Sequence, residues 1–247
     1  MDYLIQVGIK VDAIITDPPY ALTKHSWDHM IPFNQMWDKL NQLIKDDGAI
    51  ILFGNEIFSS KLRMSNPTMY RYDWKWIKTQ MTGFQSAKTQ PLRCYEDIMV
   101  FSKAKSTPSS NSRMKYYPQG LIRIDKKVKK HSINYLGQNV KEKEIIGIQE
   151  FTNYPKNILQ IPRESKLYHP TQKPIKLMEY LILTYTNEQE LVLDFTSGSG
   201  STLIACENLN RKWIGIEITE KYCQVIKKRI ENGIQLRLQF NDENKEE

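Results

Sequence analysis

The sequence predicts an α/β protein whose core is one mostly parallel sheet. Short apolar runs alternate with segments of helical spacing, which is the pattern of strands joined by crossover helices. A chain of 247 residues can form one sizeable core, or one core with an inserted subdomain. Its hydrophobic content of 40% is too high for a disordered chain. Its longest apolar runs are far shorter than the roughly 20 residues that span a bilayer.

The chain opens with a strand, a helix and a second strand. Val11 to Thr16 is a β-branched run that ends at two prolines, which cannot continue a strand. Apolar residues at helical spacing run from Phe33 to Lys45. A turn at Asp46-Asp47-Gly48 then leads into a strand from Ala49 to Phe53. This order favours parallel pairing of the two strands.

Three elements follow: a helix at Glu56 to Met64, and aromatic-rich strands at Tyr72 to Lys78 and Asp97 to Lys103. Regular structure resumes with a helix from Ile175 to Tyr185, whose preceding proline suits a helix start. The remaining elements are a strand at Leu191 to Asp194, a helix ending near Asn208, a strand at Lys212 to Glu217 and a helix at Thr219 to Ile230.

Positive charge is concentrated in one stretch. The chain has 35 Lys and Arg against 28 Asp and Glu, a net charge of +7. Between Lys103 and Lys143, eleven basic residues face two acidic ones, so this stretch carries +9. Its poor periodicity predicts an irregular insertion, and its tyrosines are suited to base stacking. Phosphate binding is the favoured interpretation, and a solvated basic loop is the alternative.

A glycine-rich turn follows the strand that ends at Asp194. Gly198 and Gly200 allow a sharp turn and a close approach of the backbone to a ligand. Glu217 ends the next strand, where a carboxylate can accept hydrogen bonds from ribose hydroxyls. Together these features predict a cofactor that contains adenosine. They leave open whether it is a dinucleotide or S-adenosylmethionine.

A second motif, Asp17-Pro18-Pro19-Tyr20, follows the first strand. The Asp17 carboxylate and the Pro18 carbonyl, held rigidly, offer two acceptors to one exocyclic amine, and Tyr20 offers a face for an extruded base. Such chemistry needs orientation and electrostatic stabilisation, with no metal and no covalent intermediate. The alternative is a rigid turn in which Tyr20 packs as a lid.

The sequence does not predict a metal site. Cys94, Cys206 and Cys223 lack the C-x-x-C spacing of zinc sites and disulfide frameworks. His25 and His29 are four residues apart, but no third ligand accompanies them. We therefore expect no metal cofactor.

The order of the motifs resembles the amino-methylating DNA methyltransferases, which transfer methyl from S-adenosylmethionine to adenine N6 or cytosine N4. Asp17 to Tyr20 comes first, then a variable insertion, then His169-Pro170-Thr171-Gln172-Lys173-Pro174, then Asp194 to Thr202. This permuted order is similar to the β group, in which the catalytic half precedes the cofactor half. The resemblance covers nearly the whole chain, and implies a Rossmann-like methyltransferase sheet with helices on both faces and an inserted target-recognition region.

The resemblance also implies a division of the chain and roles for its residues. The expected parts are a catalytic half at 1–102, a basic target-recognition insertion at 103–165 and a cofactor-binding half at 166–247. The expected catalytic residues are Asp17, Pro18, Pro19 and Tyr20. The expected cofactor-binding residues are Lys173, Asp194, Phe195, Thr196, Gly198, Ser199, Gly200, Thr202 and Glu217. The expected DNA-binding residues are Lys126, Lys127, Lys129 and Lys130. For Lys173 the alternative is an exposed lysine at a helix start.

Two features depart from the family pattern. The family usually has Asp-Pro-Phe-x-Gly-Ser-Gly, whereas here the aromatic residue, Phe195, stands one place earlier. The wall of the cofactor pocket is therefore expected to differ while the turn is kept. Family members usually also carry a Gly-Asp-Cys-like segment before the position of Met1, so one strand and one cofactor contact are expected to be missing.

The expected function is site-specific methylation of adenine N6 in double-stranded DNA, by base flipping and direct displacement. Adenine is favoured because Asp17, and not a serine, begins the catalytic turn. The alternatives are an N4-cytosine methyltransferase and an impaired DNA-binding remnant. An enzyme acting on RNA or protein glutamine is less consistent with the motif order. We also expect a possible cognate restriction enzyme, no contact with a membrane, and a monomer or homodimer. The expected setting is the cytoplasm, with the gene carried by a bacterium, phage or mobile element.

Overall fold

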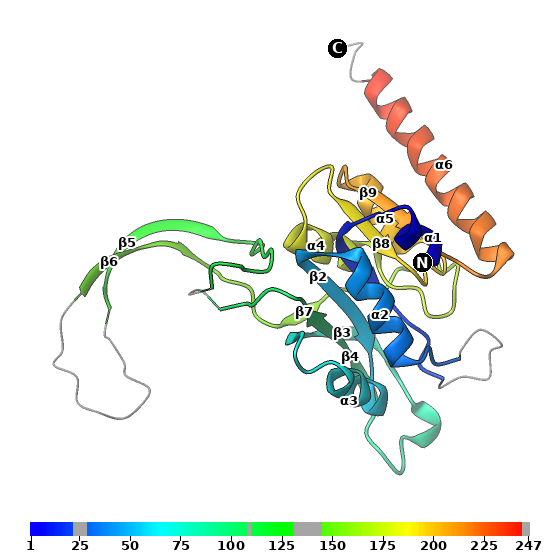
Figure 1. Ribbon diagram of the computed structural model, residues 1–247, viewed down its shortest axis with the longest axis horizontal. Helices are drawn as coiled ribbons and strands as arrows, with labels where there is room; N and C mark the ends of the chain where they lie inside the picture. The colour runs from blue at the N-terminus through cyan, green and yellow to red at the C-terminus, as the bar shows by residue number, and fades with distance from the viewer. Residues whose placement is uncertain (22–28, 108–109, 131–144, 244–247) are drawn as a thin grey trace. The chain divides into compact units, whose positions relative to one another are not determined.

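The computed structural model describes residues 1–21, 29–107, 110–130 and 145–243. These residues form two compact units (Figure 1). The first unit joins Met1–Tyr117 with Asn157–Glu247, and the second is Pro118–Lys156. Within the described residues, no helix combines the length and the apolar character that crossing a membrane requires.

A seven-stranded sheet forms the core of the first unit, in the order β7-β3-β4-β2-β1-β8-β9 (Figure 1). Its strands are β1 (Val11–Thr16), β2 (Ile44–Gly54), β3 (Tyr70–Thr82), β4 (Arg93–Phe101), β7 (Ile158–Gln160), β8 (Leu191–Asp194) and β9 (Lys212–Gly215). Strand β4 runs antiparallel to both β2 and β3, whereas the other neighbouring strands pair in parallel. The mostly parallel sheet that the sequence predicts is confirmed.

Helices cover both faces of this sheet, as the sequence predicts. The helices of the first unit are α1 (Asp2–Gln6), α2 (Phe33–Leu43), α3 (Glu56–Ser65), α4 (Ile175–Tyr185), α5 (Ser201–Asn208) and α6 (Glu220–Glu243), with a short 3₁₀ turn η1 (Phe84–Ser86). On one face, Leu40 of α2 and Phe58 of α3 pack with Ile14 of the central strand. On the other, Leu181 of α4 packs with Ile15 of the same strand. Adjacent residues of β1 therefore face opposite layers, as strand geometry requires.

Some boundaries differ from the sequence-based prediction. Helix α2 ends at Leu43, and Ile44 already has the extended backbone of β2. Strand β2 can continue beside β1 because Gly48 carries no side chain: a Cβ there would lie 2.7 Å from the Asp12 carbonyl oxygen. Strand β9 ends at Gly215, before the predicted Glu217. Helix α6 is longer than predicted, and α1 and β7 were not predicted.

The second unit is an antiparallel ribbon of two strands, β5 (Ile122–Lys130) and β6 (Ile145–Thr152) (Figure 1). The prediction of irregular structure is therefore wrong for this part of the basic stretch. Its periodicity is poor because apolar side chains are not gathered in a core: Ile122 and Ile148 are both exposed. Backbone pairing, which the side-chain pattern does not reveal, makes these segments strands.

Candidate active site

The two predicted motifs meet at the carboxyl edge of the sheet. Strands β1 and β8 are parallel neighbours, so the residues that follow them lie at the same edge. The Thr16 hydroxyl donates a hydrogen bond of 2.7 Å to Asp194 Oδ1. The Thr196 hydroxyl donates one of 3.0 Å to the backbone carbonyl of Asp17. The glycine-rich turn and the Asp17 turn are thus joined directly.

The Asp17 turn has a fixed internal geometry. The Tyr20 hydroxyl donates a hydrogen bond to Asp17 Oδ1. The Tyr20 ring packs against Phe58 of α3, with 4.6 Å between ring centroids. Pro18 is buried and Pro19 is half-buried, and the rigid pair holds the Asp17 and Tyr20 side chains on one short segment. A carboxylate and an aromatic ring are thereby presented together.

A line of buried charges reaches this turn from inside the protein. The Lys173 ammonium donates a hydrogen bond to Asp17 Oδ2 and lies 3.3 Å from Glu96 Oε2. The other oxygen of Glu96 forms an ion pair with Lys78. The Lys173 side chain is only 6% exposed, so the alternative of an exposed lysine at the helix start is wrong. Lys173 joins residues from distant parts of the sequence at one point.

The protonation of this cluster follows from burial and from the opposing charges. Burial raises the pKa of the Asp17 carboxyl, and Lys173 opposes this effect. Burial alone would lower the pKa of the Lys173 ammonium, but Asp17 and Glu96 raise it. Burial would raise the pKa of Glu96, but Lys173 and Lys78 hold it below its usual value. Burial and the Asp17 charge raise the pKa of Tyr20 well above its usual value, so its hydroxyl stays a donor.

The glycine-rich turn is organised around the carboxyl group of Asp194. This group accepts hydrogen bonds from the backbone N–H of Thr196, at 3.2 Å, and from the Thr202 hydroxyl. Burial raises the pKa of Asp194 to about 6. Gly200 has a φ of +82° and packs so closely on α6 that a Cβ would lie 2.9 Å from Ile226. The turn therefore requires glycine at this position.

Glu217 lies beside the same turn. Its two carboxylate oxygens accept hydrogen bonds of 2.8 Å from the backbone N–H groups of Gly198 and Thr219. Among the described residues, no cation forms an ion pair with Glu217. Because each carboxylate oxygen has a second lone pair, Glu217 can still accept hydrogen bonds from hydroxyl groups of a ligand.

Gln172 links the Lys173 segment to the glycine-rich turn. Its side-chain oxygen accepts hydrogen bonds from the Ser199 hydroxyl, at 3.0 Å, and from the backbone N–H of Tyr168. Arg229 of α6 donates a hydrogen bond of 2.6 Å to the Ser199 carbonyl. The Phe195 ring is instead buried in the core on the α2 face of the sheet.

The structure brings the expected catalytic and cofactor-binding residues of the first unit to one edge. The expected DNA-binding lysines belong to β5 of the second unit, where Lys126 and Lys127 are exposed. Lys129 and Lys130 also belong to β5, but their side chains lie outside the described part of the structure. His25, considered above with His29, also lies outside the described residues.

Lys78 is a site residue that the sequence-based prediction missed. Glu96 lies in the stretch from Phe84 to Phe101, which resembles the family's segment near the target-base pocket, but it was not among the expected site residues. Each stands on a strand whose other residues predict only a packed sheet. The available indication for Glu96 was that it forms, with Asp97, a pair of carboxylates directly before the apolar run that begins at Ile98. That indication does not identify its partner, because Lys173 reaches Glu96 only through the tertiary fold.

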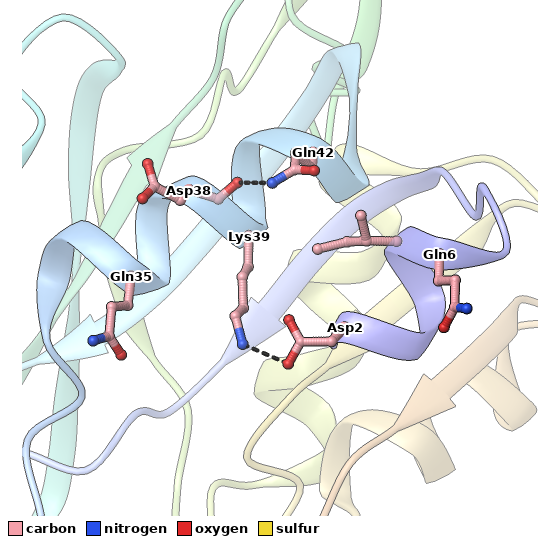
Figure 2. A pocket seen from close by; sticks show the side chains of 7 residues that line it. Asp2, Gln6, Gln35, Asp38, Lys39 and Gln42 are labelled. Carbon is pink, nitrogen blue, oxygen red and sulfur yellow. Dashed lines mark hydrogen bonds and ion pairs between the residues drawn. The ribbon is translucent and has the colours of Figure 1, made fainter.

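No group of three or more His, Cys, Asp or Glu side chains is placed to hold a metal ion within the described ranges. A hollow of about 630 Å³ lies elsewhere, between α1 and α2. Figure 2 shows Lys39 of α2 reaching across it to Asp2 of α1, at 2.7 Å. The hollow shares no residue with the site at the carboxyl edge.

In sequence, the chain is similar to known DNA methyltransferases. A family model described as DNA methylase, of the N6/N4 type, matches residues 11–228. The chain is 29% identical over 235 residues to the type II methyltransferase M.HpaI of Haemophilus parainfluenzae, covering 90% of this chain and 68% of that protein. It is 28% identical over 236 residues to the type II methyltransferase M1.MboII of Moraxella bovis, covering 90% of each.

The fold is also similar to those of solved DNA methyltransferases. The crystal structure of the M1.HpyAVI–SAM complex has a TM-score of 0.60 and 25% identity, over 92% of this chain and 93% of that one. The cytosine-N4-specific PvuII DNA methyltransferase has a TM-score of 0.61 and 18% identity, over 91% of this chain and 81% of that one. The second likeness concerns the fold alone.

Proposed function

The chain belongs to the family of N6/N4 DNA methylases. We propose that it methylates the exocyclic N6 of adenine at a specific site in double-stranded DNA. The observation that carries the proposal is the junction of the two motifs. The Asp17 turn and the glycine-rich turn share hydrogen bonds through Thr16 and Thr196. An amine held by Asp17 is thereby brought beside a cofactor held by the glycine-rich turn.

The residues of the Asp17 turn bind and orient the target amine. The Asp17 carboxylate and the Pro18 carbonyl each accept one N–H of the amine, which directs the nitrogen lone pair toward the methyl group. Tyr20 stacks on the base after it leaves the duplex. Negative charge on Asp17 stabilises the positive charge that the amine acquires during transfer. Pro19 fixes the position of these groups.

The methyl donor in this proposal is S-adenosylmethionine, and the glycine-rich turn fits it. When bound, it supplies an activated methyl group on a sulfonium sulfur. Glu217 has lone pairs left for ribose hydroxyls, and the positive φ of Gly198 and Gly200 lets the backbone approach a ligand. The residues that we propose to hold the cofactor are Lys173, Asp194, Thr196, Gly198, Ser199, Gly200, Thr202 and Glu217. The side chain of Phe195, also expected there, packs in the core and supports the turn from behind. No metal is required.

Adenine is the proposed target because Asp17 begins the catalytic turn, whereas the N4-cytosine enzymes more often begin theirs with serine. Cytosine N4 is the second candidate, since the same pair of acceptors can hold the cytosine amine. It stays a candidate because the matching family includes both N6 and N4 DNA methylases. The two bases present the same chemical group, so the hydrogen-bonding residues alone do not separate them.

We assign target recognition to the basic stretch within 103–165, between the catalytic half at 1–102 and the cofactor half at 166–247. Lys126 and Lys127 are exposed on β5 and suited to phosphate contacts, and we assign the same role to Lys129 and Lys130. M.HpaI and M1.MboII are bacterial type II methyltransferases. A type II role beside a cognate restriction enzyme, in a bacterial cytoplasm where the DNA lies, follows as part of the proposal.

The test is transfer of a labelled methyl group from S-adenosylmethionine to plasmid DNA by the purified protein, followed by nucleoside analysis and base-resolved mapping. We expect N6-methyladenine at one short recurring sequence. N4-methylcytosine without N6-methyladenine would replace the adenine assignment with the second candidate. Absence of any DNA methylation by folded protein that binds the cofactor would reject both.

A further inference from the structure

Four charged side chains lie in a row that ends at the proposed catalytic carboxylate. Lys78 pairs with Glu96, Glu96 lies 3.3 Å from Lys173, and Lys173 donates to Asp17. We propose that Glu96 is a positioning residue that shares the Lys173 ammonium with Asp17, so that Asp17 can release this ammonium when the target amine binds. The proposal rests on the role that the proposed function gives to Asp17.

Asp17 needs such a partner because both of its carboxylate oxygens are engaged. Oδ1 accepts from the Tyr20 hydroxyl, and Oδ2 accepts from Lys173. The ammonium is buried, and a buried charge that lost its only counter-ion would be strongly disfavoured. If Asp17 were that only counter-ion, Lys173 would stay on it and compete with the amine. Glu96 Oε2 offers the ammonium a second carboxylate within a short movement.

Charge balance gives Glu96 a second effect on the reaction. The row contains two carboxylates, Asp17 and Glu96, and two ammonium groups, Lys78 and Lys173, so its formal charge is zero. Loss of the Glu96 charge would leave one uncompensated positive charge near the amine. The amine itself becomes positive as it accepts a methyl group, and like charges repel strongly in a site of low dielectric constant.

The fold positions Glu96 for this task. Strand β4 alternates between the two layers: Ile98 and Val100 pack on the face covered by α4, and Glu96 shares their side of the strand. Lys173 lies immediately before α4 on that face. The next residue, Asp97, points to the opposite face and pairs with Lys75 instead.

Asp97 provides a matched control for Glu96. The two are neighbouring carboxylates on one strand with similar exposure, 8% for Glu96 and 5% for Asp97. Asp97 forms ion pairs with Arg63 of α3 and Lys75 of β3, on the face of the strand opposite Lys173. Neutralising either residue leaves two cations less well paired, but of the two carboxylates only Glu96 contacts Lys173.

The test is steady-state methyl transfer by the full chain carrying Glu96→Gln, Glu96→Asp, Lys173→Met, or Glu96→Gln combined with Lys173→Met. We expect Glu96→Gln to lower kcat about tenfold or more, with little change in cofactor affinity measured by calorimetry. Glu96→Asp should recover part of the loss. The double variant should be no slower than Lys173→Met alone, because Glu96 acts through Lys173. Asp97→Asn should lower Tm while kcat stays near that of the wild type.

Three results would overturn the inference. One is an unchanged kcat in Glu96→Gln. Another is a double variant whose loss is the product of the two single losses, because Glu96 would then act independently of Lys173. The third is an equal fall of kcat in Asp97→Asn, which would indicate a general structural effect. In each of these cases the wild type is active, whereas a wild type that methylates no DNA would reject the proposed function itself.

Discussion

At the residue scale, the site consists of side chains that the sequence identifies and others that only the fold reveals. Asp17 and Asp194 could be recognised because each stands at the carboxyl end of an apolar strand, where functional groups of parallel sheets gather. The contact of Glu96 with Lys173 could not, because the two residues are distant in the sequence. A short motif predicts a local turn well, but it does not predict which buried charges the fold will place beside that turn.

Asp194 gives a pH-dependent prediction at this scale. Its pKa rises from an ordinary value of 3.8 to about 6 in the folded protein. Between these two values the folded state binds more protons than the unfolded state, so stability falls as the pH rises. Compared with an Asp194→Asn variant, the wild type should lose up to about 3 kcal/mol of unfolding free energy between about pH 4 and pH 7.

Urea denaturation of both proteins across this pH range measures the effect. The comparison concerns only the change with pH, so any constant difference between the carboxyl and the amide cancels. Parallel curves of stability against pH for the wild type and the variant would contradict the raised pKa of Asp194. They would also contradict burial as the main cause of that shift.

At the element scale, the sequence predicted the strands and helices of the core because burial imposes a pattern on them. Val11 to Thr16 is buried throughout, and Ile175 to Tyr185 has the observed helical bounds. The ribbon of β5 and β6 was missed because no hydrophobic core imposes an alternating pattern on its sequence. Its strands depend on backbone pairing between segments in which Ile122, Ile124 and Ile148 are exposed.

The ribbon carries a prediction about DNA binding. Lys126→Gln combined with Lys127→Gln should weaken DNA binding and make its dependence on salt less steep. If both lysines contact phosphates, the slope of log K against log salt concentration should fall in magnitude by up to about 1.8. Cofactor affinity should not change, because neither lysine belongs to the unit that contains the glycine-rich turn.

Fluorescence anisotropy with a labelled duplex, repeated over a range of salt concentrations, measures this slope. Lys10→Gln combined with Lys39→Gln removes the same charge and is the matched control. Lys10 precedes β1, at the edge of the sheet opposite Asp17, and Lys39 faces the hollow of Figure 2. An equal change of slope in both double variants would contradict specific phosphate contacts by the ribbon, because overall charge would then explain the effect.

At the scale of the whole molecule, two distant parts of the chain build one site. The Asp17 turn belongs to the first half and the glycine-rich turn to the second, and the parallel pairing of β1 with β8 brings them together. The order of the motifs along the chain therefore matters less than their arrangement in the sheet. This is why the sequence could predict the fold class and the two turns of the candidate site, but not the contacts that join them.

In the proposed function, Asp17 carries the methyl transfer while the glycine-rich turn binds the cofactor. The most direct measurement is methyl transfer to plasmid DNA by an Asp17→Ala variant, with cofactor binding by the same sample measured by calorimetry. We expect wild-type cofactor binding and a rate of transfer at least about 100-fold lower than that of the wild type. A variant that binds the cofactor and still methylates DNA at the wild-type rate would contradict it.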